Sequence, residues 1–445
     1  MTESLRIGIA GLGTVGASVF GILADRGAEF ADRLGRSMVV TSVCARDRSR
    51  DRGIDLSGAV WFDDPVALAR SGEIDVFVEL MGGEDGHAKL SVEAALRAGR
   101  HVVTANKALL ATHGTALARL AEDNGVALNF EAAVAGVIPI VKTMRECLGA
   151  NRIRHVYGIM NGTCNYILTE MEREKREFAA VLSDAQDLGY AEADPTFDVG
   201  GFDTAHKLAI LTSLAFGTEV SFEDVYIEGI EKITQQDLNA AAELGFRIKL
   251  LGVALDTGNG IEQRVHPTMV PIDSPIADVD GVFNAVSISG DHMGDLMLEG
   301  RGAGAGPTAS AVIADLFDVA AGHIVPAFGR PASKLAAYRQ ARMRAHEGGY
   351  YVALELYDRP GAVAAIAKRM AEQGISLESI IQKPRMLPHR QERVEKSDTM
   401  PVVLITHDTL EQAVREALDA IEVDGHISSS PRMIRIEKLQ VGTGK

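Results

Sequence analysis

Acidic residues gather in front of a lysine in residues 189–207 of the chain. Asp203 and Lys207 stand four residues apart at the start of a predicted helix, and this spacing places both on one helical face. Glu192 and Asp198 precede them in a predicted loop. Together these acids could bind the ammonium group of a small cationic substrate. The lysine, if it stays protonated there, could serve as a general acid.

Each of these residues also has an ordinary structural explanation. Asp203 is a good helix N-cap, and an Asp-to-Lys pair at this spacing is a common surface pair that contributes about 0.2–0.5 kcal/mol. The Asp194-Pro195 pair is a common turn. A functional site is favoured because four acids converge on one lysine, which is followed by the apolar residues 208–211.

The start of the chain predicts the element that would position a cofactor. Residues 5–10 have the pattern of a buried strand, and an apolar-periodic helix follows the glycine-rich segment 11–16. In this context Gly11 makes the tight turn, Gly13 lets a pyrophosphate approach the backbone, and Gly16 allows close helix packing. We therefore predict an α/β protein with a Rossmann-type dinucleotide-binding domain over residues 1–150; a glycine-rich turn without a ligand is the less favoured alternative.

The end of the second predicted strand, residues 38–44, bears on the choice of dinucleotide. An acid at this position binds the ribose of NAD, whereas an arginine accommodates the 2′-phosphate of NADP. Arg46 comes first after the strand, so NADP is favoured, and Asp47 leaves NAD open. For Arg48 and Arg50, a solvated loop is about as well supported as a role in binding the cofactor.

Predicted strands at 76–80 and 101–103 end where open α/β sheets bind their ligands, and the first leads into residues 81–83. The strand at 101–103 leads into Thr104 and Lys107, although a lysine that starts a surface helix is the ordinary alternative. Glu131 follows a strand at 127–130, and carbonyl groups turned inward beside this carboxylate could hold a hard cation. A plain strand-to-helix loop is the better default for that segment.

The pattern changes near residue 152, which predicts an α+β substrate-binding and oligomerisation domain over residues 151–321. The segment 161–166 is rich in hydrogen-bonding groups in front of a predicted helix, whose first amides could face a carboxylate. Alternating residues at 247–253 and 263–266 predict antiparallel strands. A glycine-rich break at 302–308 precedes an apolar helix.

A third unit is predicted at the C-terminus. A linker over residues 322–347, with a charged helix-like stretch up to Glu347, leads to a domain at 348–445. Its predicted elements follow the order βαββαβ, with a polar insert at 385–398 that we expect to be a hairpin loop.

Composition limits the possible functions. The chain has 445 residues, of which 46% are hydrophobic and 24% charged, as is ordinary for a soluble globular enzyme. The net charge of −16 argues against non-specific binding to nucleic acid or an anionic membrane. Three scattered cysteines suggest neither disulfides nor a zinc site, which fits the cytoplasm. No apolar run approaches membrane-spanning length, and the N-terminus lacks a signal pattern.

The chain resembles homoserine dehydrogenases over about residues 5–320, through several motifs taken together. These motifs are Gly11–Gly16, Thr104–Lys107, Asn161–Tyr166, Gly189–Lys207 and Gly302–Thr308. The Asn-Gly-Thr-Cys-Asn-Tyr segment at 161–166 and the Tyr-Ala-Glu-Ala-Asp-Pro segment at 190–195 are far more specific than the glycine fingerprint. The resemblance implies a reversible, NAD(P)-dependent conversion of L-aspartate 4-semialdehyde to L-homoserine in the biosynthesis of threonine, methionine and isoleucine.

The resemblance also implies roles for single residues. It makes Lys207 the proton donor, with Lys107 as a second catalytic residue that also contacts the cofactor. The substrate would be bound by Glu192, Asp203, Tyr190, Asp198 and Thr163. The cofactor would contact Gly11, Gly13, Thr14, Val15, Gly16, Arg46, Thr104, Lys107, Gly189 and Gly304. A monovalent cation, sodium, would be bound by Glu131 and the carbonyls of Val134, Gly136 and Ile138, where Val137 departs from the second glycine of many relatives.

Reduction of the aldehyde needs a proton for the developing alkoxide, and Lys207 can supply it. A free lysine has a pKa near about 10.4, and we expect the neighbouring carboxylates to keep Lys207 charged at neutral pH. Oxidation should then need a higher pH.

The C-terminal unit resembles the ACT domain, a small amino-acid-sensing module, with its turn at residues 358–361. For a homoserine dehydrogenase this implies threonine as a feedback ligand; a purely oligomerising domain is a nearly equal alternative, and a homo-oligomer is expected in either case.

Two other classes of function remain open from the residues. An acylating semialdehyde dehydrogenase would need a nucleophilic cysteine with a histidine base, for which Cys164 is the candidate. A non-catalytic sensor of dinucleotides and amino acids would need neither Lys207 nor the acids before it.

Overall fold

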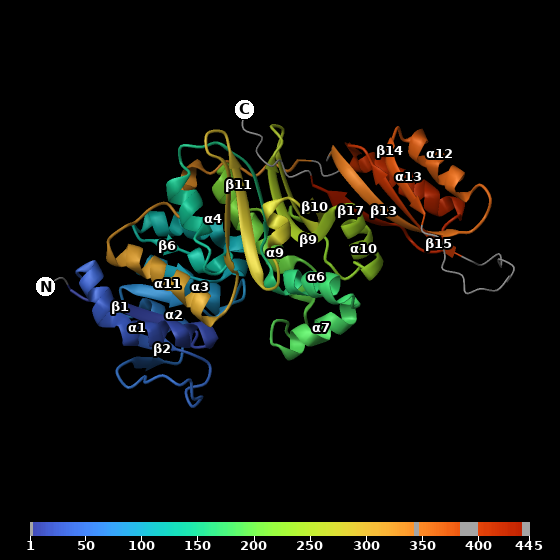
Figure 1. The fold of residues 1–445 in the computed structure, drawn as a ribbon. Helices are drawn as coiled ribbons and strands as arrows, with labels where there is room; N and C mark the ends of the chain where they lie inside the picture. The colour runs from blue at the N-terminus through green and yellow to red at the C-terminus, as the bar shows by residue number, and fades with distance from the viewer. Residues whose placement is uncertain (1–2, 342–346, 383–398, 438–445) are drawn as a thin grey trace.

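The computed structural model describes residues 3–341, 347–382 and 399–437 (Figure 1). Over these residues the N-terminal unit contains a six-stranded parallel sheet with the strand order β3-β2-β1-β4-β5-β6. Its strands are β1 (Leu5–Ala10), β2 (Met38–Cys44), β3 (Val60–Phe62), β4 (Val76–Glu79), β5 (His101–Thr104) and β6 (Leu128–Asn129). This is the doubly wound order of a Rossmann domain, so the sequence-based prediction of this fold is confirmed.

Helices cover both faces of this sheet. They are α1 (Thr14–Leu34), α2 (Pro65–Arg70), α3 (His87–Arg97), α4 (Lys107–Asp123) and, from much later in the chain, α11 (Ala305–Ala320). Helix α11 packs beside α1, where the rings of Phe30 and Phe317 meet edge to face with centroids 5.2 Å apart. The predicted glycine-rich break at 302–308 thus returns the chain to the dinucleotide-binding unit.

The central unit is built on antiparallel strands, as the alternating residues predict. Its strands are β7 (Ile153–Ile159), β8 (Tyr226–Ile227), β9 (Phe246–Asp256), β10 (Ile261–Pro271), β11 (Phe283–Gly290) and β12 (Gly294–Arg301). Strands β9 and β10 pair along their whole length, from Ile261 opposite Asp256 to Pro271 opposite Phe246. Its helices are α6 (Gly162–Glu174), α7 (Phe178–Asp187), α8 (Thr196–Val199), α9 (Phe202–Phe216) and α10 (Gln235–Glu243).

The 3₁₀ turn η1 (Glu131–Ala133), helix α5 (Ile140–Lys142) and the π-helical turn η2 (Thr143–Cys147) connect the first two units. Two further 3₁₀ turns lie later in the chain: η3 (Pro275–Asp278) between β10 and β11, and η4 (Ala332–Lys334) after α11. The predicted charged helix before Glu347 is wrong over residues 335–341, where the chain runs extended and forms isolated bridges to Thr218 and Ile261. The rest of that stretch, like the insert at 385–398, lies outside the described residues.

The C-terminal unit has the predicted βαββαβ order with one addition, the two-residue strand β16 before its second helix. Its elements are β13 (Glu347–Tyr357), α12 (Ala362–Glu372), β14 (Leu377–Gln382), β15 (Thr399–Thr406), β16 (Thr409–Leu410), α13 (Glu411–Asp424) and β17 (Arg432–Ile436). The last strand also pairs with β10, through Thr268 opposite Arg435 and Met269 opposite Ile436. Over the described residues, this short pairing joins the two sheets into one of eleven strands.

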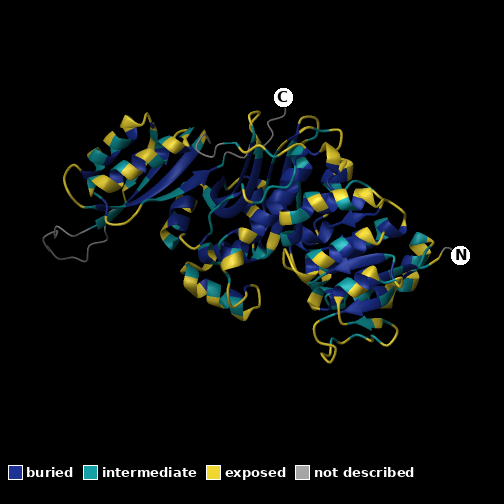
Figure 2. Cartoon of the chain, turned by 180° about the vertical axis from the view of Figure 1, so that it is seen from behind, coloured by how far each residue is buried: buried dark blue, intermediate teal, exposed yellow. Residues whose placement is uncertain are grey.

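Burial follows the layers of the fold (Figure 2). The strands are buried, while the outer faces of the helices are exposed. Strands β1 and β4 are mostly apolar, apart from Arg6 and Glu79, and almost wholly buried, as expected for central parallel strands covered on both faces. Among the described residues, none of the helices is both long enough and apolar enough to cross a membrane.

Candidate active site

Helix α9 carries the lysine and one acid of the predicted site. The helix begins after Gly201, whose φ of +89° suits a glycine, so Asp203 lies in the first turn and is not the N-cap. Asp203 and Lys207 are 3% and 6% exposed, and Lys207 Nζ lies 2.7 Å from Asp203 Oδ2. The surface-pair explanation for these two residues is therefore wrong. Lys207 also donates a hydrogen bond to the carbonyl of Met160 at 2.6 Å.

A second lysine reaches the same carboxylate from the dinucleotide-binding unit. Lys107 is the first residue of α4, where the side chain of Asn106 caps the helix. Its Nζ lies 2.7 Å from Asp203 Oδ1 and 5.6 Å from the centre of the Phe197 ring. Asp203 thus bridges two ammonium groups, one from each unit, at the carboxyl end of β5.

Asn161 joins the two acids on the other side. Its Nδ2 donates to Asp198 Oδ1 and to Asp203 Oδ2, both at 2.8 Å, and its Oδ1 accepts from the Cys164 amide as the N-cap of α6. The segment 161–166 was expected in front of the helix, but α6 already begins at Gly162. The sequence pattern alone does not distinguish Asn161 within this segment, because an Asn-Gly pair is equally typical of a simple turn.

The charges of this cluster change the acidity of its members. Burial favours the neutral carboxyl of Asp203, but the ammonium groups of Lys207 and Lys107 outweigh burial and hold its pKa well below the usual range. Burial likewise opposes the charge of Lys107, yet the attraction of Asp203 prevails and raises the pKa of Lys107. Burial and the repulsion of the acids around it raise the pKa of Asp198.

Lys207 responds in the opposite direction to Lys107. Complete burial lowers its pKa from the ordinary value, and the charge of Lys107 adds to this, so that the attraction of Asp203 does not compensate. The carboxylates therefore do not hold the pKa of Lys207 at its ordinary value. The reason is burial, which a sequence pattern does not reveal. The result is one lysine that holds its proton firmly beside one that gives it up more readily.

The loop before α8 forms the outer wall of the site. Thr163 Oγ1 donates to the Tyr190 carbonyl at 2.6 Å, and the exposed Tyr190 ring meets Tyr166 edge to face with centroids 5.1 Å apart. Glu192 is exposed, and its charge contributes to the raised pKa of Lys107. Gly189 precedes them with a φ of +75°. Thr163 is therefore tied to the loop through Tyr190, and Glu192 is exposed nearby in the chain.

The glycine loop after β1 has room where a dinucleotide would need it. A Cβ on Gly11 would lie 2.4 Å from the Leu80 carbonyl oxygen, and one on Gly16 would lie 1.9 Å from that of Gly11. A Cβ on Gly13 would meet nothing within 4 Å. Two glycines are therefore required by packing, while Gly13 faces open space at the start of α1, where Thr14 and Val15 present the first helix amides.

Other predicted cofactor residues lie around this loop. Arg46 is exposed directly after β2. Gly304 has a φ of +120° and is the N-cap of α11. The Thr104 side chain is buried, and its hydroxyl donates to Glu79 Oε2 at 2.7 Å, which leaves its backbone for any cofactor contact. Glu79, which the sequence analysis did not single out, also accepts the amides of Met81 and Gly82.

Residues of the predicted cation loop form hydrogen bonds with one another. The two carboxylate oxygens of Glu131 accept the amides of Val141 and Lys142 at 2.9 and 2.8 Å. The carbonyl of Ile138 accepts the Ile140 amide at 2.7 Å, and Gly136 has a φ of +60°. Within the described residues, no three His, Cys, Asp or Glu side chains are grouped in a way that could hold a metal.

The thiol of Cys164 is unsuited to nucleophilic attack. Complete burial raises its pKa well above the ordinary value, and its Sγ donates to the Asp198 carbonyl at 3.2 Å. A catalytic cysteine needs the opposite shift, towards the thiolate. The acylating type of dehydrogenase is therefore disfavoured.

Fold and site together define a dinucleotide-dependent oxidoreductase with a buried lysine near the carboxyl ends of its nucleotide-binding sheet. The family model described as "Homoserine dehydrogenase, NAD binding domain" matches residues 11–131, and the one described as "Homoserine dehydrogenase" matches residues 139–317. The chain belongs to the homoserine dehydrogenase family, whose members are oxidoreductases acting on a CH–OH group.

Similar proteins support this over the whole chain. The homoserine dehydrogenase of Neisseria gonorrhoeae is 44% identical over 98% of this chain and 99% of its own. The crystal structure of a homoserine dehydrogenase from Thiobacillus denitrificans matches with a TM-score of 0.91 and 42% identity, covering 99% of both chains. A hyperthermophilic archaeal homoserine dehydrogenase in complex with NADPH matches with a TM-score of 0.62 and 25% identity, covering 71% of this chain and 97% of its own.

Proposed function

We propose that this protein interconverts L-aspartate 4-semialdehyde and L-homoserine, with Lys207 as the proton donor during reduction. The observation that carries the assignment is the buried cluster of Lys207, Asp203 and Lys107, in which two lysines of opposite pKa shift share one carboxylate. A general acid with a lowered pKa releases its proton more readily than a free lysine does.

A dinucleotide bound at the glycine loop would supply hydride to the carbonyl carbon of the substrate. As the C–H bond forms, the carbonyl oxygen gains negative charge and takes a proton from the Lys207 ammonium. Lys207 is left neutral and recovers its proton from solvent before the next turnover. Lys107, whose pKa is raised, keeps its charge and stabilises the oxyanion electrostatically.

Acids in the outer wall account for the substrate's ammonium group. Glu192 is exposed at the rim, and Asp198 is half-buried beside Asn161. We assign Glu192, Asp198 and Asp203 to the substrate, with Thr163 and Tyr190 shaping the entrance. The direct test is to add L-aspartate 4-semialdehyde and measure the loss of NADPH absorbance, with L-homoserine as the product. A dinucleotide that stays reduced would contradict the proposal and favour a non-catalytic sensor of dinucleotides and amino acids.

We further infer that NADP is the preferred dinucleotide. Arg46 is exposed shortly after β2, at the position that accommodates a 2′-phosphate. The archaeal relative was solved with NADPH, which agrees with this assignment. Asp47 is engaged locally, because its Oδ1 accepts both the amide and the hydroxyl of Ser49. It is therefore less available to a ribose hydroxyl than the sequence alone suggests.

A sodium ion at the Glu131 loop also belongs to the proposal. Burial raises the pKa of Glu131, and burial together with the charge of Glu131 raises the pKa of Asp315 to about 7. A cation would relieve this crowding of buried acids, and carbonyls of Val134, Gly136 and Ile138 are oxygen ligands of the kind that a hard cation prefers. The ion would act on the structure of the loop; measuring the unfolding temperature in sodium against a large organic cation tests it.

For the C-terminal unit we propose the ACT domain and threonine as its ligand, near the turn at 358–361. Support comes from the βαββαβ order and from Gly361, whose φ of +90° shapes the start of α12. Threonine should inhibit the full chain, and Asp358→Ala should weaken this inhibition, while Lys368→Ala on the exposed face of α12 should not. Unchanged activity across a threonine titration would leave the unit with an oligomerising role only.

We also propose a homo-oligomer in the cytoplasm. Strands β12 and β14 end the long sheet of the described residues, and an open sheet edge favours pairing with another chain. The domain boundaries proposed from sequence, 1–150, 151–321, 322–347 and 348–445, remain part of this proposal.

A further inference from the structure

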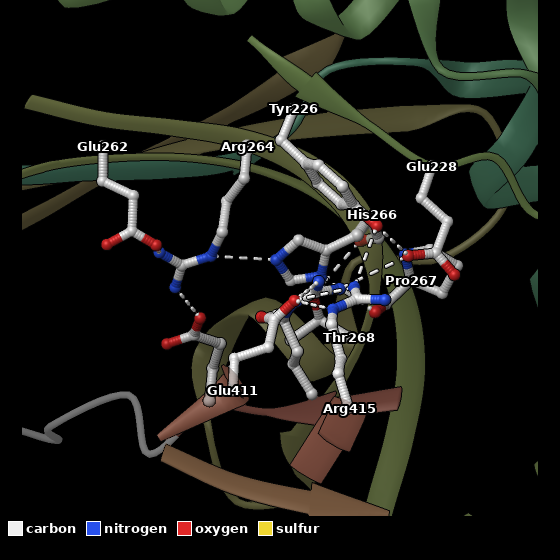
Figure 3. Close-up of polar contacts among 11 residues, drawn as sticks. Tyr226, Glu228, Glu262, Arg264, His266, Pro267, Thr268, Glu411 and Arg415 are labelled. Atoms are coloured by element: carbon white, nitrogen blue, oxygen red, sulfur yellow. Dashed lines mark hydrogen bonds and ion pairs between the residues drawn. The ribbon is translucent and has the colours of Figure 1, made fainter. Parts of the chain in front are cut away.

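The C-terminal unit contacts the central unit through a buried cluster of charged side chains (Figure 3). Arg435 of β17 is only 1% exposed, and it binds the carboxylate of Glu411 through hydrogen bonds of 2.7 and 2.8 Å. From the same position it reaches across to the central unit. Its Nη1 lies 3.4 Å from Glu228 Oε2, and its guanidinium lies 5.0 Å from the centre of the Tyr226 ring.

Arg415 of α13 strengthens this contact. It binds Glu411 at 2.7 Å and donates to the Tyr226 hydroxyl at 3.3 Å, and that hydroxyl in turn donates to Glu228 Oε2 at 3.1 Å. Figure 3 shows Tyr226, Glu228 and Arg415 within one network of polar contacts. A cleft of about 660 Å³ opens beside the network, between the two units, so Glu228 remains within reach of solvent. The segment 226–228 is thus one of the parts of the central unit that the C-terminal unit contacts, together with β10 and α10.

The next residues of that segment lie against the active-site loop. Ile230 donates its amide to the Val199 carbonyl at 2.9 Å. A Cβ on Gly229 would lie 2.3 Å from the same carbonyl oxygen and 2.7 Å from Gly200 Cα. The two backbones are therefore in direct contact, and a shift of Gly229 has to move the bend at Val199–Gly201.

This bend sets the distance between the two acids of the site. Asp198 stands immediately before it and Asp203 shortly after it, and both accept hydrogen bonds from the single amide of Asn161. Because one amide group has to serve both carboxylates, a movement of the bend weakens at least one of the two bonds. Asp203 also aligns Lys207 and Lys107, so the disturbance reaches the proton donor.

We propose that Glu228 is a positioning residue for the reaction, through which the C-terminal unit holds the bend that carries Asp198 and Asp203. This inference rests on the proposed function for its kinetic test. The backbone of β8 pairs with β10, the Arg435–Glu228 contact adds a side-chain restraint at the end of β8, and Gly229 transmits its position to Val199. The C-terminal unit thereby acts on substrate binding without contributing a side chain to the site.

A matched pair of variants separates this role from general docking. Glu228→Gln removes the charge that faces Arg435, whereas Arg432→Gln removes another ion pair of the same interface, to Asp237 on α10 at 3.1 Å. Glu228→Gln should raise KM for L-aspartate 4-semialdehyde by about 2–30-fold, the range for coupling through packed networks, with KM for NADPH unchanged. Arg432→Gln should leave both constants unchanged. Equal kinetic effects of the two variants, or none with Glu228→Gln, would overturn the proposal.

A second pair tests the transmission directly. Gly229→Ala places a methyl group against Val199 and should raise the same KM, while Gly149→Ala, whose Cβ meets nothing within 4 Å, should not. Hydrogen exchange over residues 196–203 provides a reading that needs no turnover. We expect faster exchange of residues 196–203 in Glu228→Gln than in Arg432→Gln, even if the chain is inactive towards the semialdehyde. The exchange experiment therefore distinguishes failure of the assigned reaction from failure of the coupling. Equal exchange in the two variants would refute it.

Discussion

Replacing Lys207 by methionine tests the proton donor, because methionine keeps much of the side-chain volume and removes the ammonium group. Loss of a general acid lowers turnover by about 10²–10⁴-fold, which corresponds to about 2.7–5.4 kcal/mol of transition-state stabilisation. The structure also predicts a cost in stability. The Met160 carbonyl loses its 2.6 Å hydrogen bond in a buried place, at about 1–3 kcal/mol, while Asp203 keeps Lys107 and Asn161 as partners.

Lys249 provides the matched control. It is a second buried lysine, on β9, which donates to the Val279 carbonyl at 2.6 Å and to Asp280 at 3.1 Å, both in the loop before β11. Lys249→Met should therefore lower the unfolding temperature much as Lys207→Met does, with turnover within a few-fold of the parent. The assay is NADPH oxidation with L-aspartate 4-semialdehyde, combined with a binding titration of NADPH, which should stay unchanged in both variants.

The pH dependence of the parent enzyme distinguishes the two lysines. A proton donor has to be charged, so the rate of reduction falls as pH rises through its pKa. Because the pKa of Lys207 lies below its ordinary value of 10.5, the fall should be complete at a lower pH than a free lysine would give, and oxidation should rise over the same range. Were Lys107 the donor, the fall would come above 10.5, because its pKa is raised. Near-parental turnover of Lys207→Met, or a fall only above 10.5, would refute the assignment to Lys207.

Three further predictions concern the cofactor loop and the acids. Gly16→Ala should lose about 1–3 kcal/mol of stability, because its methyl group would overpack against Gly11. Gly13→Ala should unfold at the parental temperature in thermal melts and bind NADPH more weakly in titrations. Equal behaviour of the two variants would contradict the geometry. Arg46→Ala should cost about 1.5–3 kcal/mol of NADPH affinity with NADH binding unchanged, and equal losses for both dinucleotides would exclude a 2′-phosphate contact. Asn161→Ala should raise KM for the semialdehyde by roughly tenfold, because both acids lose a hydrogen bond. As a control, Asp64→Ala removes the cap of α2, which should reduce stability by about 0.5–2 kcal/mol and leave that KM unchanged. A parental KM in Asn161→Ala would count against the bridging role.

Local patterns were enough to predict the fold in outline. Buried parallel strands are continuous apolar runs, and the tight turn at Gly11 and the close packing at Gly16 admit only glycine, so the dinucleotide-binding unit was recognisable from residues 5–23. Alternation of period two likewise predicted β9 and β10, and the βαββαβ order of the C-terminal unit followed from the same rules. The i,i+4 spacing of Asp203 and Lys207 correctly placed them on one face of α9.

The properties that make a site of these residues depend on segments that are distant in sequence. Lys107 and Asn161 reach Asp203 from other elements, separated from it by 96 and 42 residues along the chain, and no local period encodes such contacts. Burial then sets the acidity, since the same carboxylate raises the pKa of the partly exposed Lys107 but cannot offset the desolvation of Lys207. The sequence determines the charge and spacing of these residues, whereas the low-dielectric surroundings of their side chains arise only when the units pack together.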